Sequence, residues 1–333
     1  MSEPQADQSQ AFCQLDPDHI LDAVEALGYR CDGRLLALNS YENRVYQIGI
    51  EDTEPIVAKF YRPDRWTDAA IEEEHAFTLE LEAEEIPVIA PLTDASGHTL
   101  FHQGPFRLAL YPRRGGHAPE LDRPDQLEQM GRFLARIHNL GAIRDFIHRP
   151  TLDIASFGEQ PRQYLMDSGL IPPELQDSYA SLTADLLQAI RAAFERAGAV
   201  RQLRLHGDCH PGNILWTDAG PHIVDLDDAR MGPAIQDLWM LLSGDRMEMT
   251  ARLADVLDGY TQFRVFDPRE LHLLEALRTL RMIHYAAWLA RRWDDPAFPQ
   301  AFPWFNGSRY WDEHILSLRE QAALLQEPPL VWD

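Results

Sequence analysis

One short segment constrains this chain more than any other. The segment Leu205–Leu215 contains a polar loop between apolar residues. A second, mainly apolar run, Ile223–Asp227, follows it. The loop contains Asp208, and Asn213 follows it five positions later. Asp225 comes twelve positions after Asn213, at the end of the second apolar run. An Asp, an Asn and an Asp in this order and at these spacings are typical of a phosphoryl-transfer centre.

The residue types match that chemistry. A transferring phosphoryl group carries dense negative charge, which a hard cation such as Mg²⁺ neutralises through oxygen ligands. Asn213 and Asp225 offer an amide oxygen and a carboxylate, so we predict that both bind Mg²⁺. Asp208 then remains to face an acceptor hydroxyl and to accept its proton.

Two other interpretations of this segment remain open. His206, Cys209 and His210 could form a zinc site, although no second ligand cluster in the chain pairs with them. The segment could also be an ordinary polar turn between two strands. Three spaced oxygen-bearing side chains beside apolar strands rarely arise by chance, so we favour phosphoryl transfer.

A lysine lies in a strand of the kind that contacts nucleotide phosphates. Lys59 ends the run Ile56-Val57-Ala58-Lys59, which is similar to the Val-Ala-Ile-Lys strand of kinases. Alternation along a strand puts Val57 and Lys59 on one face. Val57 could then cover an adenine while Lys59 reaches the α- and β-phosphates. The alternative is a surface lysine at a strand edge.

The helix expected after this strand, residues 67–84, contains three candidate partners for Lys59, which are Glu72, Glu73 and Glu74. Helical spacing favours Glu74, because it shares a face with four apolar positions, Ala70, Ile71, Phe77 and Leu81. A carboxylate within an apolar stripe needs a cation. Glu72 points away from the stripe and Glu73 lies at its margin, so we predict that Glu74 braces Lys59.

A glycine-rich phosphate loop is missing from the usual place between the first two strands. Residues 38–43, Leu-Asn-Ser-Tyr-Glu-Asn, occupy that position. Ser40 and Asn43, with backbone N–H groups, could donate hydrogen bonds to phosphate oxygens. An ordinary turn rich in Asn and Ser is the alternative.

Composition limits the class of protein. The chain has 333 residues and a formal net charge of −23, which repels nucleic acid and anionic membranes. Three cysteines, Cys13, Cys31 and Cys209, make no disulfide framework and suggest a reducing compartment. Residues 1–10 have no signal-peptide pattern, and no run approaches a membrane span. We expect a cytoplasmic monomer with no nucleic-acid or membrane partner.

The periodicity predicts an α+β fold with two lobes, as in protein kinases. Strand patterns over residues 35–61, 99–100 and 106–111 flank the helix of 67–84. Later patterns are helical, near residues 126–140, 178–197, 236–242, 249–263 and 268–292 and near the C-terminus. We predict a disordered tail at 1–14, a nucleotide-binding lobe at 15–112, and a catalytic and substrate lobe at 113–333.

Together these motifs resemble the aminoglycoside phosphotransferase-like kinases, and within them the bacterial stress response kinase A group. The resemblance runs from about residue 15 to 330 and rests on five segments, at residues 39–47, 59–63, 205–210, 224–230 and 288–299. The group implies an ATP- and Mg²⁺-dependent serine/threonine protein kinase that acts in the bacterial stress response. It also implies that Ser40 contacts ATP and that Asp225 is an active-site residue beside Asp208.

Two other functions stay open at this stage. The same chemistry could act on a small alcohol, such as an amino alcohol, a sugar or an antibiotic, and the Trp- and Arg-rich stretch 288–311 could then line the acceptor site. We favour core packing for that stretch. A non-enzymatic scaffold would be expected to have lost Lys59, Asp208, Asn213 or Asp225, and all four are present.

Overall fold

The computed structural model describes residues 12–332, which form two compact units built from separate stretches of the chain. Unit 1 contains the described residues up to Ala118, together with Ile147–Arg149 and Gly212–Asp227. Unit 2 contains the remaining described residues. Of the predicted tail at 1–14, only residues 12–14 are described, and they form a turn. The predicted lobes, 15–112 and 113–333, stay predictions.

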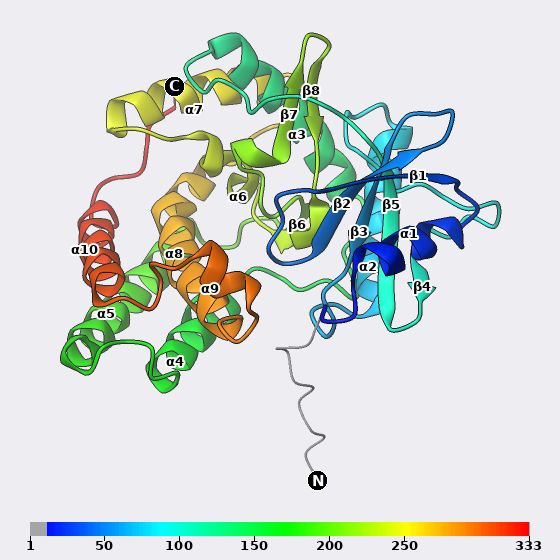
Figure 1. Cartoon of the computed structure of the whole chain (residues 1–333). Helices are drawn as coiled ribbons and strands as arrows, with labels where there is room; N and C mark the ends of the chain where they lie inside the picture. The colour runs from blue at the N-terminus through cyan, green and yellow to red at the C-terminus, as the bar shows by residue number, and fades with distance from the viewer. Residues whose placement is uncertain (1–11, 333) are drawn as a thin grey trace. The chain divides into compact units, whose positions relative to one another are not determined.

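Unit 1 is built around a five-stranded antiparallel sheet with the strand order β1-β2-β3-β5-β4 (Figure 1). The strands are β1 (Cys31–Ala37), β2 (Arg44–Ile50), β3 (Ile56–Phe60), β4 (Phe101–Gln103) and β5 (Phe106–Pro112). Strands β2 and β3 pair antiparallel, with Ile48 opposite Ile56. The strands predicted within 35–61 and at 106–111 are confirmed, but the strand predicted at 99–100 is displaced to β4, at Phe101–Gln103.

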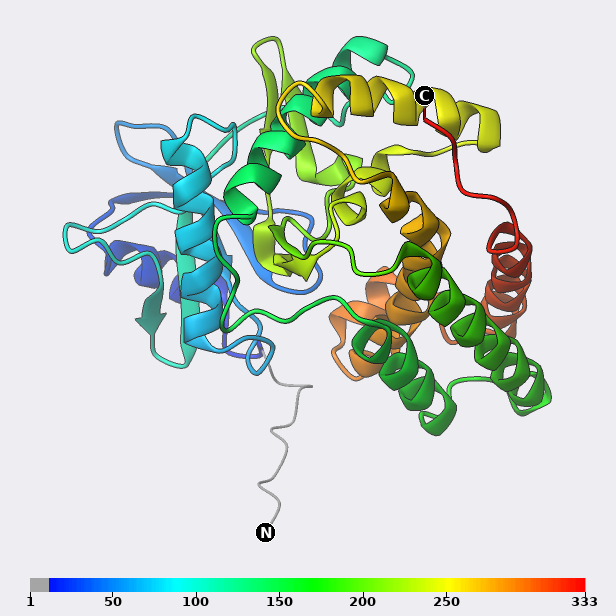
Figure 2. The same ribbon diagram turned by 180° about the vertical axis from the view of Figure 1, so that it is seen from behind.

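Two helices cover opposite faces of this sheet. Helix α1 (Pro17–Glu25) packs in the same core cluster as Ala58 and Phe60 of β3. Helix α2 (Asp68–Ala83), whose N-cap is Thr67, lies along the sheet (Figure 2) and contributes Ile71 to a second cluster that contains Ala109 of β5. Ala109 is the register partner of Lys59. Lys59 therefore belongs to the α2 face, as alternation along the strand predicts.

A short hairpin completes unit 1. Strands β7 (Ile214–Thr217) and β8 (Gly220–Ile223) pair antiparallel, and Ile214 is opposite Ile223. Ile223 also bridges to Val88, in the chain that follows α2. These contacts fix the residues on both sides of the hairpin, which include Asn213 and Asp225.

Unit 2 is mainly helical, as predicted. Its α-helices are α3 (Pro124–Gly141), α4 (Gln160–Asp167), α5 (Pro173–Ala197), α6 (Ile235–Leu238), α7 (Arg246–Tyr260), α8 (Leu274–Arg291), α9 (Ala297–Ala301) and α10 (Ser308–Leu324). The strands β6 (Leu203–Leu205) and β9 (Arg230–Gly232) pair in a small ribbon. Short 3-10 or π turns are η2 (Ala155–Glu159), η5 (Trp239–Leu241) and η6 (Pro268–Leu273), while η3 (Pro211–Asn213) and η4 (Leu226–Asp228) join the two units.

The Trp- and Arg-rich stretch 288–311 forms an aromatic cluster, which agrees with the core-packing interpretation. Phe298, Phe305 and Trp311 are fully buried, whereas Trp304 is 47% exposed. Helices α4 and α9 are short and were not predicted, because a helix of so few residues has too little apolar periodicity to recognise. Among the helices of residues 12–332, none has the length and apolar character that crossing a membrane requires.

Helices α3 and α7 pack against each other, and two glycines lie where their backbones approach closely. A Cβ atom added to Gly131 of α3 would lie 2.0 Å from the carbonyl oxygen of Val256 on α7. A Cβ atom added to Gly259 of α7 would lie 1.9 Å from the carbonyl oxygen of Glu128 on α3. The two backbones approach so closely that neither position accommodates a side chain.

We expect Gly131→Ala to lower the free energy of unfolding by about 2 kcal/mol, because overpacking costs more than the gain in helix propensity of about 1 kcal/mol. Urea unfolding measures the change. Met247→Ala, at a position of α7 that is 77% exposed, is the control and should change stability by less than about 0.5 kcal/mol. An unchanged midpoint for Gly131→Ala would contradict the close crossing.

Candidate active site

Five of the six predicted site residues line one pocket of unit 1. They are Ser40, Lys59, Glu74, Asn213 and Asp225. The cavity has a volume of ≈ 380 Å³, and its walls include Leu38, Val45, Val57, Ile89, Leu215 and Leu226. Apolar walls with a few convergent polar groups are typical of a small-molecule site. The sixth residue, Asp208, belongs to unit 2.

Lys59 is a buried cation in this pocket, with only 6% of the residue exposed. Its Nζ atom lies 2.8 Å from Asp225 Oδ1 and 3.3 Å from Asp227 Oδ1. Burial alone would lower the pKa of Lys59, but the two carboxylates together raise it above its ordinary value. The lysine therefore keeps its positive charge inside the pocket.

Glu74 faces the interior, as its helical spacing predicts, and is 2% exposed. Its nearest cation, however, is Arg149, whose Nη2 atom lies 3.7 Å from Glu74 Oε2. Burial raises the pKa of Glu74 to about 7, and the charges of Lys59 and Arg149 act in the opposite direction. The predicted ion pair between Lys59 and Glu74 is thus not formed. Lys59 pairs with Asp225 and Asp227, which lie nearer to it, and Glu74 lies beside Arg149.

Asn213 and Asp225 lie on either side of the β7–β8 hairpin. The backbone N–H of Val224 donates to the Asn213 carbonyl at 3.0 Å, which ties the two positions together. Asp225 has a left-handed backbone, with φ 61°, and its side chain is 51% exposed. A non-glycine residue in this region carries about 1–3 kcal/mol of strain, which is typical of functional sites.

This donor set fits a hard divalent cation. Asn213 offers an amide oxygen and Asp225 a carboxylate, and Mg²⁺ is commonly held by one or two such protein ligands plus phosphate oxygens. In the part of the chain that the structure describes, no three His, Cys, Asp or Glu side chains are grouped to hold a metal by themselves. Cys209, from the zinc interpretation, is buried, and burial raises the pKa of its thiol well above the ordinary value.

Asp227 anchors the loop that replaces the glycine-rich phosphate loop. Its Oδ2 atom accepts hydrogen bonds from Asn43 Nδ2, at 3.0 Å, and from Arg65. Asn43 Oδ1 in turn accepts from the backbone N–H of Arg62 at 3.0 Å. The Ser40 hydroxyl donates to the Asn43 carbonyl at 3.3 Å. Asn43, which the sequence analysis considered as a phosphate donor, therefore holds the loop in place.

A short segment remote in sequence supports the pocket from behind α2. Glu73 accepts hydrogen bonds from the backbone N–H groups of Ile147, His148 and Arg149, at 2.5–2.9 Å. The Arg149 guanidinium donates to the Ala70 carbonyl at 2.8 Å and lies over the Trp66 ring at 4.4 Å. Sequence reasoning missed this arginine, since nothing near residue 149 signals a tie to residues more than 70 positions earlier.

Asp208 is held in unit 2 by groups on several elements. It lies in the loop after β6, where its carboxylate forms an ion pair with Arg281 of α8. Its Oδ2 atom is 3.6 Å from His210 Nε2, and its backbone N–H donates to His206 Nδ1 at 3.3 Å. Arg281 was not predicted as a site residue, because it lies 73 positions away on a helix with no distinguishing motif.

Asp237 fixes the backbone of this loop. It is fully buried and accepts hydrogen bonds from the N–H groups of His206, at 2.9 Å, and Gly207, at 2.8 Å. Burial alone would raise the pKa of Asp237, but hydrogen bonds and the facing histidines, above all His138, lower it. Gly207 has φ 85°, and a Cβ atom there would lie 2.2 Å from the Asp228 carbonyl oxygen, so only glycine fits.

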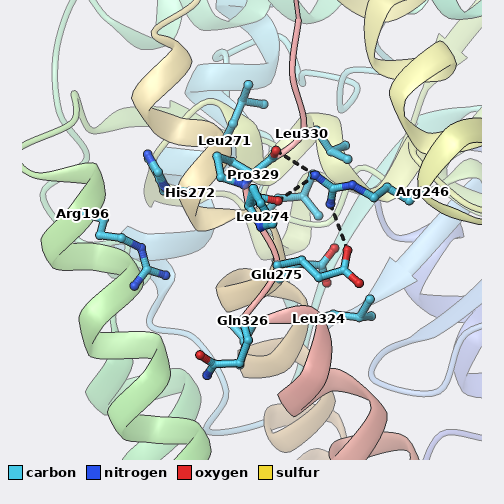
Figure 3. Close-up of a pocket in the computed structure, with 13 residues that line it drawn as sticks. Arg196, Arg246, Leu271, His272, Leu274, Glu275, Leu324, Gln326, Pro329 and Leu330 are labelled. Carbon is cyan, nitrogen blue, oxygen red and sulfur yellow. Dashed lines mark hydrogen bonds and ion pairs between the residues drawn. The ribbon is translucent and has the colours of Figure 1, made fainter.

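A pocket elsewhere in unit 2 contains none of the predicted residues (Figure 3). It lies between α5, α7, the start of α8 and the chain after α10. Arg246 there donates to the carbonyls of Pro328, at 2.8 Å, and Pro329, at 2.9 Å, and pairs with Glu327. These bonds attach the C-terminal segment to α7, which indicates a structural function.

Comparison with known proteins gives the family. The profile of a family described as "Phosphotransferase enzyme family" matches residues 34–274. The stress response kinase A of Escherichia coli strain K12 is 49% identical over 319 residues, which cover 96% of each chain. The serine/threonine protein kinase RdoA of Salmonella typhimurium is 47% identical over 324 residues, 97% of this chain and 98% of the relative. The chain belongs to the stress response kinase A group of the phosphotransferase enzyme family.

Solved structures agree on the fold. An amicoumacin kinase in complex with AMP-PNP and Ca²⁺ has a TM-score of 0.72 at 19% identity, and 95% of each chain is covered. A microcompartment-associated aminopropanol kinase has a TM-score of 0.69 at 18% identity, with 92% of this chain and 96% of the other covered. The predicted α+β kinase-like fold is confirmed, with its small antiparallel sheet and its larger helical part.

We expect Asp237→Asn to lower the free energy of unfolding by about 2 kcal/mol or more, because an amide leaves one buried backbone N–H of the loop without an acceptor. Urea unfolding at neutral pH measures it. The control is Asp245→Asn at the exposed N-cap of α7, where Asn caps as well as Asp does and the change should be below about 0.5 kcal/mol. Equal losses for the two variants would contradict this function of Asp237.

Glu270 gives a prediction about pH. It is 3% exposed, and its Oε2 atom accepts a hydrogen bond from the backbone N–H of Ile235 at 2.8 Å. Burial raises the pKa of Glu270 to about 7. In the unfolded chain a glutamate has a pKa of about 4.3. The folded state thus binds the Glu270 proton more tightly than the unfolded state does. The contribution of Glu270 to the free energy of unfolding is therefore lost as the pH rises from about 4.3 through about 7.

Glu270→Gln keeps an oxygen for the Ile235 N–H but cannot ionise. We expect this variant to lose less stability than the wild type between pH 5 and pH 8, as measured by urea unfolding at a series of pH values. The exposed change Glu313→Gln, whose carboxylate is 61% exposed on α10, is the control and should leave the pH profile unchanged. Parallel profiles for wild type and Glu270→Gln would rule out a raised pKa for Glu270.

Proposed function

We propose that this protein is a serine/threonine protein kinase that transfers the γ-phosphoryl group of ATP in a Mg²⁺-dependent reaction. The observation that supports this most is the pocket of unit 1 that is lined by Ser40, Lys59, Glu74, Asn213 and Asp225. The apolar walls suit an adenine, with Val57 on one side, and the charged end suits phosphates. ATP enters there as the phosphoryl donor.

Each residue has a place in this proposal. Lys59 neutralises the α- and β-phosphates, and Ser40 with the N–H groups of its loop contacts phosphate oxygens. Asn213 and Asp225 would hold Mg²⁺, which supplies charge neutralisation for the β- and γ-phosphates when bound. Glu74 acts at longer range, as a buried charge near Lys59. Asp225 and Asp227 hold Lys59 in place, so its position is preorganised.

The transfer itself is a displacement at phosphorus. The acceptor oxygen forms a bond to the γ-phosphorus, the bond from that phosphorus to the β,γ-bridging oxygen breaks, and ADP leaves. The hydroxyl proton passes to the Asp208 carboxylate. Asp225 serves as the second active-site carboxylate. The Escherichia coli relative is named a stress response kinase, so we propose that this kinase acts in the bacterial stress response, as a monomer in the cytoplasm.

A small-alcohol kinase is the second candidate. It is favoured by the solved structures of similar fold, which include an amicoumacin kinase and an aminopropanol kinase. The pocket for ATP and the function of Asp208 would be the same. The two proposals differ only in the acceptor.

We expect Asp208→Asn to lower the rate of phosphoryl transfer by about 10²- to 10⁴-fold, because the acceptor proton loses its base. ATP affinity should stay within about 3-fold of the wild type, since the proposed nucleotide ligands are unchanged. The assay uses Mg²⁺, γ-labelled ATP and a generic serine-containing protein, with a fluorescent ATP analogue to measure binding.

Asp218→Asn is the matched control, because this exposed aspartate in the β7–β8 turn undergoes the same chemical change outside the pocket. It should retain the wild-type rate. Label on protein that disappears only in Asp208→Asn supports the protein kinase. ATP binding without label on any protein would favour the small-alcohol kinase, and full activity of Asp208→Asn would refute the assignment of the base.

A further inference from the structure

The surface of unit 2 beside Asp208 carries arginines that the proposed phosphoryl transfer does not use. Arg281, His284, Trp288 and Arg291 of α8 are spaced by three, four and three residues, so they share one side of the helix. Arg281 forms the ion pair with Asp208. The side of α8 that starts at the proposed base therefore continues through a histidine and a tryptophan to a second arginine.

A third arginine, Arg230 at the start of β9, contacts the same aromatic ring as His284. Arg230 lies over the Phe157 ring at 4.7 Å, and His284 stacks on that ring with centroids 4.4 Å apart. Burial lowers the pKa of His284 to about 3, and the charge of Arg230 acts in the same direction. Arg230 itself is paired with Asp228 at 2.5 Å. The histidine is thus neutral, and Arg230 has a carboxylate partner.

Unlike Arg230, Arg291 and Arg281 have guanidinium groups that can bind a further anion. Within residues 12–332 no carboxylate pairs with Arg291, whose guanidinium lies 5.0 Å from the centre of the Tyr164 ring on α4. Burial lowers its pKa from the ordinary value, so part of its hydration has been removed. Arg281 contacts Asp208 through Nη1 and is 38% exposed. Since a guanidinium has five N–H donors, most of those on Arg281 are left for another anion.

These two arginines determine which acceptors can approach the base. A cationic acceptor would meet like charge beside Asp208, whereas an acceptor with a carboxylate near its hydroxyl would gain charge-assisted hydrogen bonds. We propose that the acceptor site recognises an acidic peptide segment, in which Arg281 and Arg291 bind carboxylates that flank the phosphorylated serine or threonine. This inference rests on the proposed protein-kinase function and specifies its substrate class.

The spacing of the arginines suggests where the acidic residues lie. Ten residues of helix separate Arg281 from Arg291, which corresponds to about 15 Å along α8. An extended peptide covers that length in four to five residues at about 3.3 Å each. The arginine next to Asp208 thus suits an acidic residue adjacent to the acceptor, and Arg291 suits one about four residues further along.

The test compares two serine peptides of equal length, one flanked by glutamates and the other by lysines. The net charge of −23 slows the approach of any acidic peptide, so the assay is run at 0.15 M ionic strength, where the screening length is about 8 Å. We expect the wild type to phosphorylate the glutamate peptide with a kcat/KM at least ~10-fold higher than the lysine peptide.

The variants separate recognition from chemistry. Arg291→Gln should raise KM for the glutamate peptide by ~10-fold and leave kcat within ~3-fold, because Arg291 does not contact the base. Arg281→Gln should raise KM and also lower kcat, since it removes the partner of Asp208. Arg291→Lys, which keeps the charge, should recover part of the KM loss. Arg309→Gln, at an arginine that is 89% exposed on α10, makes the same charge change and should match the wild type.

Each result is decisive. A preference for the lysine peptide, or no preference, overturns the inference while leaving the protein kinase intact. An unchanged preference in both Arg281→Gln and Arg291→Gln overturns the assignment of these arginines. If neither peptide is labelled although ATP binds, the protein-kinase proposal fails and this inference fails with it. If Arg291→Gln does not fold, the ratio of KM values for Arg291→Lys and wild type decides, with equal values overturning the assignment.

Discussion

The structure of unit 1 depends on neutralising one buried ammonium group. Lys59 lies within a sheet face, where an unpaired charge would cost several kcal/mol. Asp225 and Asp227 supply the opposite charge, and Asp225 adopts a left-handed backbone at that point. Asp227 extends the network to Asn43, and hence to the loop that contains Ser40. The position of the candidate phosphate-binding loop therefore follows from the electrostatics of a lysine on β3, the strand that pairs with β2.

Much of this arrangement can be predicted from the sequence. Alternation along β3 assigns Lys59 to one face, helical spacing buries Glu74, and the motif around Asp208, Asn213 and Asp225 indicates the chemistry. The inferences about Lys59 and Glu74 succeed because they rest on short-range geometry, which depends on the backbone period alone, whereas the chemistry that the motif indicates stays a prediction. The family assignment, confirmed by relatives at 47–49% identity, agrees with the same motifs.

The partners of those residues could not be predicted in the same way. Periodicity shows that Glu74 is buried, but the choice between Lys59, Arg149 and another cation is made by contacts between distant segments. Arg149 and Arg281 lie in stretches with no motif, and each meets a carboxylate more than 70 positions away. Only a three-dimensional arrangement reveals such pairs, since neither composition nor spacing marks them.

The division of unit 1 among three stretches of the chain has a consequence for biosynthesis. The sheet strands are complete by residue 112, but the carboxylates that neutralise Lys59 come from residues 225 and 227. A nascent chain emerges from its N-terminus, so the sheet must wait for more than a hundred further residues before its buried lysine is paired. The N-terminal unit is therefore expected to reach its final packing late in synthesis, and a fragment that ends at residue 118 would expose this lysine without its counter-charges.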